Sequence, residues 1–160
     1  MAKIERKYLA HYINAAQQSS GADDYERLGK DLEEFSPELA AQVETKKNIL
    51  GETSVLISSY EKTGAVAPYY AEAGSALFER LQDIIDNGRV LDDLKTEVVE
   101  VKLWEAAESG TYPAVKEEAY IEVTSYGGDT TGYQIPFTLH FTGSKVKGSF
   151  NISTKTFNQG

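Results

Sequence analysis

The chain has 160 residues, no cysteine, two histidines and a formal net charge of −9 at pH 7. A chain of this length predicts one domain, 1–160, with an ordinary hydrophobic core, and the lack of cysteine excludes disulfides and thiolate metal sites. The negative charge argues against a surface that binds the phosphates of nucleic acid, because such binding needs clustered Lys and Arg. Acidic residues are in excess within 22–108, as expected of a surface that keeps a protein soluble.

The sequence gives no sign of a membrane segment or a cleaved leader. It contains no run of 18 apolar residues, so we expect no membrane-spanning segment. Near the N-terminus, His11, Tyr12 and Asn14 interrupt the apolar stretch that a signal peptide requires. We therefore expect a protein that folds in the cytoplasm without processing.

The N-terminal residues 1–21 end in a polar Gly/Ser stretch and are interpreted as an arm. Their short aromatic segment could form an edge strand or dock on a neighbouring molecule. A strand within the chain's own sheet is an equal alternative. The next segment, 25–35, has apolar spacing that fits either a helix or a strand, and we interpret 27–34 as a strand.

Residues 36–53 lack a sustained pattern of either kind and predict a long loop between two strands. A connection of that length inside a compact domain is usually functional or disordered. Alternation of apolar and polar residues then resumes over 54–62, which predicts a strand.

An amphipathic helix is predicted over 75–87. Ser75 is suited to cap its N-terminus, and Gly88 lies where a left-handed terminating residue is common. Its apolar stripe predicts packing across a sheet face. The stripe consists of Leu77, Phe78, Leu81, Ile84 and Ile85, and the residues outside it are Glu79, Arg80, Asp83 and Asp86.

The C-terminal part alternates most regularly and predicts antiparallel strands. Segments 95–105 and 112–124 are interpreted as a hairpin. The stretch 119–152 alternates with period two between turn residues, which predicts three strands, or two hairpins that share a strand. The turns are expected at the glycine-rich 127–132 and at Gly143-Ser144. The whole chain then has about seven strands and one helix.

No catalytic or metal-binding arrangement is predicted. The glycine-rich 127–132 lies between strands and lacks the Lys-Ser/Thr pair of a phosphate loop, so it is interpreted as a tight turn. Trp104 is expected in the core or at its rim, and His140 at a surface or an interface. The adjacent acids on strands point to opposite faces and do not converge for acid–base catalysis; these pairs are Glu33/Glu34, Asp92/Asp93 and Glu117/Glu118.

Four stretches carry a resemblance to a known family: 44–55, 68–86, 101–105 and especially 120–150, which includes SYGGDTTGYQIPF. They resemble the major tail tube proteins of long-tailed, siphovirus-type bacteriophages, most closely those from phages and prophages of Gram-positive hosts. The resemblance spans roughly 25–157. The motif is not a catalytic one, so it points to the family and not to a chemistry.

The resemblance implies a mainly β fold, a β-sandwich or partly closed barrel of about seven strands with one flanking α-helix. It implies a structural virion protein, not an enzyme, without a cofactor or metal. Such subunits form rings of six that stack into a tube, and DNA passes through the tube without specific binding. The implied partners are other copies of the chain, a tape-measure protein and a tail-terminator protein, and no membrane.

In that family a long loop between two early strands reaches the adjacent subunit or ring, and 36–53 is the corresponding segment. The candidate interface residues in it are Glu44, Lys46, Lys47, Asn48, Ile49 and Leu50. An acidic tube wall would repel DNA phosphates over the roughly 8 Å that physiological salt leaves unscreened. The candidate wall residues are Asp31, Glu33 and Glu122.

Two other functions fit the same residues. The first is a β-sandwich that binds a ligand such as a carbohydrate, with Trp104 and surface tyrosines as stacking platforms. The second is the tube protein of a phage-derived secretion particle with the same fold.

Overall fold

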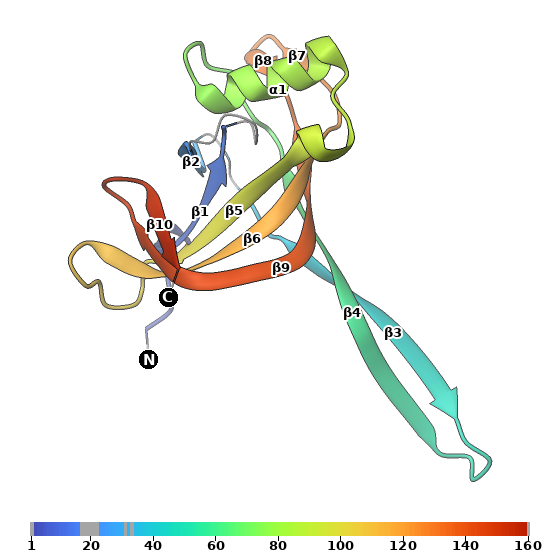
Figure 1. Cartoon of the computed structure of the whole chain (residues 1–160). Coiled ribbons are helices and arrows are strands. Elements are labelled where there is room, and N and C mark those ends of the chain that lie inside the picture. Colours follow the sequence, from blue (N-terminus) through green and yellow to red (C-terminus); the bar gives the residue numbers. More distant parts are fainter. Residues whose placement is uncertain (1, 17–22, 31, 33, 160) are drawn as a thin grey trace.

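The computed structural model describes residues 2–16, 23–30, 32 and 34–159. Its main element is an antiparallel sheet in the order β2-β1-β5-β6-β9-β4-β3, with β10 paired to β9 outside this path, and β7 and β8 form a small sheet of their own (Figure 1). The strands are β1 Leu9–Asn14, β2 Tyr25–Leu28, β3 Glu38–Lys47, β4 Thr53–Val66, β5 Lys95–Lys102, β6 Thr111–Val123, β7 Gly127–Asp129, β8 Gly132–Gln134, β9 Phe137–Asn151 and β10 Thr156–Gln159.

The sheet is open, with β2 and β3 as its edges. The predicted mainly β fold with one flanking α-helix is confirmed, and the main sheet is not closed into a barrel. In Figure 1 the long strands β5, β6 and β9 curve together through the body, whereas the β3–β4 hairpin projects away from it.

The helix α1, Ala76–Asn87, forms where the sequence predicts it. The Ser75 hydroxyl accepts a hydrogen bond from the backbone N–H of Phe78, and Gly88 ends the helix with φ 58° and ψ 44°. The same Ser75 hydroxyl donates to a carboxylate oxygen of Glu26 at 2.9 Å, which joins the start of the helix to β2. Both helix ends are therefore set by local chemistry.

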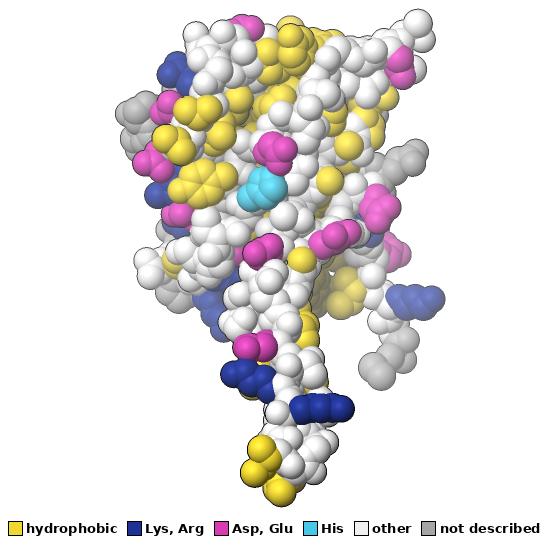
Figure 2. Space-filling view, turned by 90° about the vertical axis from the view of Figure 1, so that its right-hand side faces the viewer, with side chains coloured by type: hydrophobic (Ala, Val, Ile, Leu, Met, Phe, Trp, Pro, Cys, Tyr) yellow, Lys and Arg dark blue, Asp and Glu magenta, His cyan; other side chains and the backbone are white. Residues whose placement is uncertain are grey.

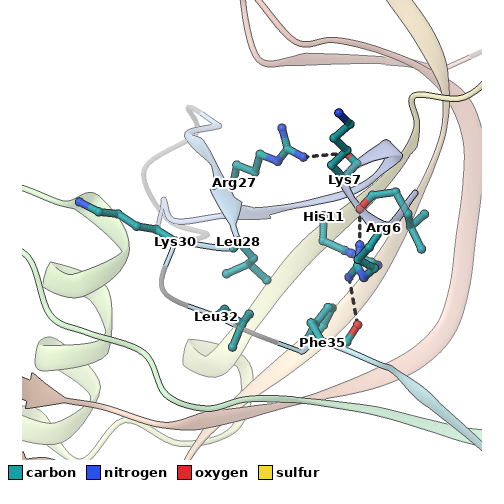
Figure 3. Close-up of a pocket in the computed structure, with 10 residues that line it drawn as sticks. Arg6, Lys7, His11, Arg27, Leu28, Lys30, Leu32 and Phe35 are labelled. Carbon is teal, nitrogen blue, oxygen red and sulfur yellow. Dashed lines mark hydrogen bonds between the residues drawn. The ribbon is translucent and has the colours of Figure 1, made fainter. Parts of the chain in front are cut away.

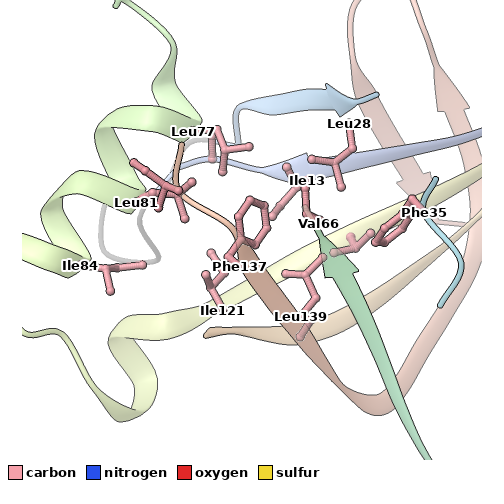
Figure 4. Close-up of a cluster of buried hydrophobic side chains, with 14 residues drawn as sticks. Ile13, Leu28, Phe35, Val66, Leu77, Leu81, Ile84, Ile121, Phe137 and Leu139 are labelled. Atoms are coloured by element: carbon pink, nitrogen blue, oxygen red, sulfur yellow. The ribbon is translucent and has the colours of Figure 1, made fainter. Parts of the chain in front are cut away.

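The larger core lies between α1 and one face of the sheet, here called the helix face (Figure 4). Leu77 and Leu81 of α1 meet Ile121 and Phe137 from β6 and β9, and Val66 of β4 closes the cluster. The opposite face carries a second cluster at the other end of the strands, built around the ring of Phe150. Alternate residues of one strand thus serve two cores, as period two requires.

The N-terminal segment is part of the chain's own sheet. β1 pairs with β2 on one side and with β5 on the other, so for Leu9–Asn14 the structure has the second of the two interpretations, a strand in its own sheet and not a free arm. The following strand is shorter than the predicted 27–34, because β2 ends at Leu28.

The prediction of a long loop over 36–53 is wrong for most of that segment. Residues Glu38–Lys47 form β3, which pairs with β4 over ten positions, and only a short turn at 48–52 connects the two strands. Apolar residues alternate in β3 only over Leu39, Ala41 and Val43, and this pattern is too short to have indicated the strand.

The prediction of a turn at Gly143-Ser144 is also wrong. β9 continues through it from Phe137 to Asn151. Opposite Glu118 of β6, the three residues 142–144 of β9 take the place of one, and Gly143 has φ +87°. The glycine therefore supports a bulge that bends the strand, which is the other common role of glycine in a sheet. The predicted tight turn at 127–132 is confirmed as the β7–β8 hairpin.

Candidate assembly interface

The candidate site is the projecting hairpin, defined here as β3, the turn 48–52 and residues 53–62 of β4. The C-terminal end of β4, Thr63–Val66, pairs with β9 in the body. The rest of β4 pairs only with β3, and the two strands project from the body together. At about 3.3 Å per residue the ten residues 53–62 extend roughly 30 Å. The residues of β3 and the first nine of β4 are all exposed.

The projecting hairpin has one apolar face. The register places Val43 opposite Ile57, and Tyr60 opposite Ala41 across a bulge between Gln42 and Val43. Alternation continues this face into the helix face of the body at Val66. The apolar hairpin face consists of Leu39, Val43, Val55, Ile57 and Tyr60, whose side chains are 55–61% exposed.

The other hairpin face is mainly polar. Gln42 and Ser59 oppose each other there, and Glu38, Glu44 and Lys46 lie on the same side. Both faces are in solvent, which a two-stranded ribbon tolerates poorly, because an isolated hairpin is at best marginally stable in water. Contiguous exposed apolar side chains on a soluble protein mark interaction surfaces. The hairpin therefore has the composition of a contact with another protein chain.

An ion pair holds the root of the hairpin to the body. The ammonium of Lys62 on β4 lies 2.8 Å from a carboxylate oxygen of Glu117 on β6, and both side chains are largely buried, at 15% and 5% exposure. The same ammonium lies 4.5 Å from the ring centre of Phe141. Beside it, a Cβ on Gly64 would lie 2.9 Å from the ring of Phe35, so any larger residue at this position of β4 would require that buried ring to shift.

Replacing Lys62 with methionine is expected to lower the free energy of unfolding by about 3 kcal/mol, because the buried Glu117 carboxylate would lose its counter-ion. Urea denaturation followed by circular dichroism measures this loss. The matched control is the double variant K62M/E117L, in which neither charge of this pair is left and much of the stability should return. A single variant as stable as the unaltered chain would show that the pair does not anchor the hairpin.

The tip of the hairpin is an ordered turn. The side-chain oxygen of Asn48 accepts hydrogen bonds from the backbone N–H groups of Leu50 and Glu52, at 2.9 and 3.0 Å. This turn presents Ile49 and Leu50 to solvent, at 103% and 76% exposure. Figure 2 shows hydrophobic side chains at the very end of the hairpin, with basic side chains just before them.

The structure brings all six predicted interface residues together on this hairpin. All six are exposed, and Asn48 also builds the turn; the others are Glu44, Lys46, Lys47, Ile49 and Leu50. Sequence reasoning missed the apolar hairpin face. A signal for it exists in the alternation of Leu39, Ala41 and Val43, which lies inside the segment interpreted as a loop.

The predicted wall acids are only partly placed. Asp31 and Glu33 lie outside the residues that the structure describes. Glu122 is exposed on β6, on the face opposite the helix, and one of its carboxylate oxygens lies 2.5 Å from Nε2 of His140 on β9. Its role in a tube wall stays a prediction.

Charges near Glu122 alternate in sign. Lys95 pairs with Glu118 at 3.2 Å and Lys116 with Glu97 at 2.9 Å. This part of the sheet is therefore close to electrically balanced, and it does not form an acidic stripe.

Within the described ranges, no three His, Asp or Glu side chains gather in a way that could hold a metal ion. None of the helices in those ranges is long and apolar enough to cross a membrane.

Comparison with solved structures places the fold among known ones. The hybrid solid-state NMR and cryo-EM structure of the SPP1 tail tube superposes with a TM-score of 0.62 at 18% sequence identity, and the match covers 91% of this chain and 78% of that chain. The fold is similar to that of a phage tail tube protein. No protein-family model matches the sequence, and neither does any curated protein.

Proposed function

We propose that this chain is the structural subunit of a siphovirus-type phage tail tube. In this proposal copies assemble through the projecting hairpin into stacked rings of six, and the rings form the conduit through which DNA is ejected. The observation that carries the proposal is the exposed apolar face of the hairpin on a fold similar to that of the SPP1 tail tube. It assigns the chain to the virion and gives it no enzymatic activity.

The geometry of the hairpin supports assembly between unlike surfaces. A ribbon that projects about 30 Å from its own body cannot be covered by that body. In the proposed assembly the hairpin contacts a different surface of a second copy, and such head-to-tail contacts close into rings or grow into filaments. The open sheet edges at β2 and β3 add a further reason for association, because unpaired strand edges invite pairing with another chain.

The net charge of −9 supports a conduit over a nucleic-acid binder. Phosphates bind where Lys and Arg cluster, and a chain with an excess of acids offers DNA few such clusters, so DNA would pass without adhering. The tape-measure and tail-terminator proteins are the further partners of the proposed tube. The tube of a phage-derived secretion particle would use the same hairpin contact.

Negative-stain electron microscopy of the concentrated protein tests this function. The unaltered chain is expected to form rings or tubes. A shortened chain, in which an Asn-Gly turn replaces 43–58 between the paired Gln42 and Ser59, is expected to stay monomeric. Asn-Gly closes a two-residue hairpin, and three of the five residues of the apolar hairpin face, Val43, Val55 and Ile57, are removed together with the tip. The proposal fails if the unaltered chain remains monomeric at high concentration, or if the shortened chain still assembles.

A further inference from the structure

A pocket of about 220 Å³ lies on the helix face beside the root of the projecting hairpin. Its lining comes from five strands of the main sheet, β1, β4, β5, β6 and β9 (Figure 1). The buried Val98 belongs both to this lining and to the larger core, and the buried ring of His11 contacts Phe35 of that core edge to face at 4.8 Å. Figure 3 shows this ring from the neighbouring pocket, which His11 also lines. The volume is below the roughly 300–1,000 Å³ typical of sites for organic ligands, so it suits a small ion.

The pairing of β5, β6 and β9 gathers charged side chains around this pocket. Glu117 of β6 lies directly opposite Lys145 of β9. Two residues along β6, Val115 lies between Glu100 of β5 and Lys147 of β9. Because residues two apart on a strand have their side chains on the same face, both lysines are on the face that carries the two carboxylates.

The lining is basic, although the chain as a whole is acidic. It contains four lysines and two carboxylates, whereas the whole chain has 16 Lys and Arg against 25 Asp and Glu. Lys62 is paired with Glu117, and Nε2 of His11 lies 3.3 Å from a carboxylate oxygen of Glu100. The other three lysines have no carboxylate of the described residues within ion-pair distance; they are Lys102, Lys145 and Lys147. Their positive charge therefore attracts an external anion to the pocket.

Glu117 adds a hydrogen-bond acceptor to this basic lining. Its side chain is buried, and one carboxylate oxygen, Oε1, lies 2.8 Å from the Lys62 ammonium. The other oxygen, Oε2, is buried as well and has no hydrogen-bond donor among the described residues. Buried polar atoms in native proteins nearly always have a partner. A ligand that fits this pocket therefore combines negative charge for the lysines with a hydrogen-bond donor for Oε2.

We propose that this pocket binds inorganic phosphate in a form that still carries a proton. The ammonium groups of Lys102, Lys145 and Lys147 donate charge-assisted hydrogen bonds to the phosphate oxygens. The remaining P–OH group donates to Oε2 of Glu117. The site goes beyond the proposed function and does not rest on it, because all of its residues belong to one copy.

The Glu117 acceptor sets the selectivity of the proposed site. Sulfate has the shape of phosphate but carries no proton at neutral pH, so it would place an unprotonated oxygen against the carboxylate. The phosphodiesters of DNA lack a proton too. A phosphate monoester loses its last proton at roughly pH 6, so above that pH the inorganic ion is the better ligand.

Isothermal titration calorimetry on the dilute, unaltered chain at slightly alkaline pH and low ionic strength tests the site. The dissociation constant of inorganic phosphate is expected to be at least about tenfold lower than those of sulfate and methyl phosphate, because a site built around a hydrogen bond rejects analogues that cannot make it. Lys145→Gln together with Lys147→Gln is expected to weaken phosphate binding at least about tenfold. Lys3→Gln together with Lys155→Gln is the matched control, because it removes the same charge at exposed positions outside the pocket; it should bind phosphate like the unaltered chain.

Glu117→Gln separates the acceptor from the lysines. Its side-chain amide can donate a hydrogen bond to any oxyanion, so this variant should bind sulfate about as well as phosphate. The Lys145/Lys147 variant is changed only at exposed positions and should be folded by circular dichroism, so it tests the site even if Glu117→Gln unfolds. Absence of phosphate binding, equal affinity for phosphate and either analogue, or unchanged binding by the Lys145/Lys147 variant would each overturn the site, and none of them bears on the proposed tube function.

Discussion

Changing Val43 and Ile57 together to serine is expected to give a folded monomer that no longer assembles. The two residues are cross-strand partners at the centre of the apolar hairpin face, and their side chains are 58% and 56% exposed in the single chain. Burying large aliphatic side chains contributes about 1.5–3 kcal/mol each. Removing two of them from every contact of a repeating assembly should therefore abolish tubes over the accessible range of concentration, as sedimentation velocity and electron microscopy would show.

The control for this variant lies on the other side of the same ribbon. Gln42 and Ser59 are the adjacent cross-strand pair on the polar face, and Gln42→Ser with Ser59→Ala should assemble normally. The thermal unfolding of both double variants should remain close to that of the unaltered chain, because the changed positions are exposed. Tubes formed by the Val43/Ile57 variant would show that the apolar hairpin face is not the contact surface.

Changing Arg80 to methionine is expected to lower the free energy of unfolding by about 3–5 kcal/mol. Arg80 is a buried residue of α1, and its guanidinium donates hydrogen bonds to the backbone carbonyls of Asn14, Ala16 and Lys95. Hydrogen bonds from a charged donor contribute about 1.5–3 kcal/mol each, and the carbonyls would lose this donor. Guanidinium denaturation measures the change.

The neighbouring Glu79 provides the comparison for Arg80. It lies on the same helix but is exposed, so Glu79→Met makes a similar change in the helix without unsatisfied carbonyls. That variant should unfold within about 0.5 kcal/mol of the unaltered chain. Equal stability of the two methionine variants would show that the arginine does not connect the helix to β1 and β5.

Local signals account for the parts of the fold that were predictable. Ser75 and Gly88 mark the ends of α1 through their own backbone chemistry, and the hairpin of β5 and β6 has the alternation of a half-buried sheet. Arg80 shows where such signals end. Because Arg80 lies outside the apolar stripe of the helix, the sequence predicts that its side chain is exposed to solvent. In the structure it is buried, and its hydrogen-bond acceptors are carbonyl groups 15 to 66 residues away in the sequence.

The same reasoning explains what sequence could and could not show of the candidate site. The segment that holds the six candidate interface residues was found through a family resemblance. Its strand β3 was not predicted, because both faces of the ribbon are exposed and its apolar alternation covers only Leu39, Ala41 and Val43. A glycine such as Gly143 is compatible with a turn or with a bulge. Only the register of β9 against β6 distinguishes the two.

The solvent-exposed pairing of β3 with β4 has a consequence for hydrogen–deuterium exchange. In a free copy the amides of this ribbon should exchange rapidly, because opening it disrupts almost no buried apolar contact. Those of β5 and β6, which carry both cores, should exchange slowly. When copies assemble, exchange of the β3 and β4 amides should become slower, while that of β5 and β6 should change little. The slowed fraction of the β3 and β4 amides would then measure how much of the protein is in assemblies, without any label added to the chain.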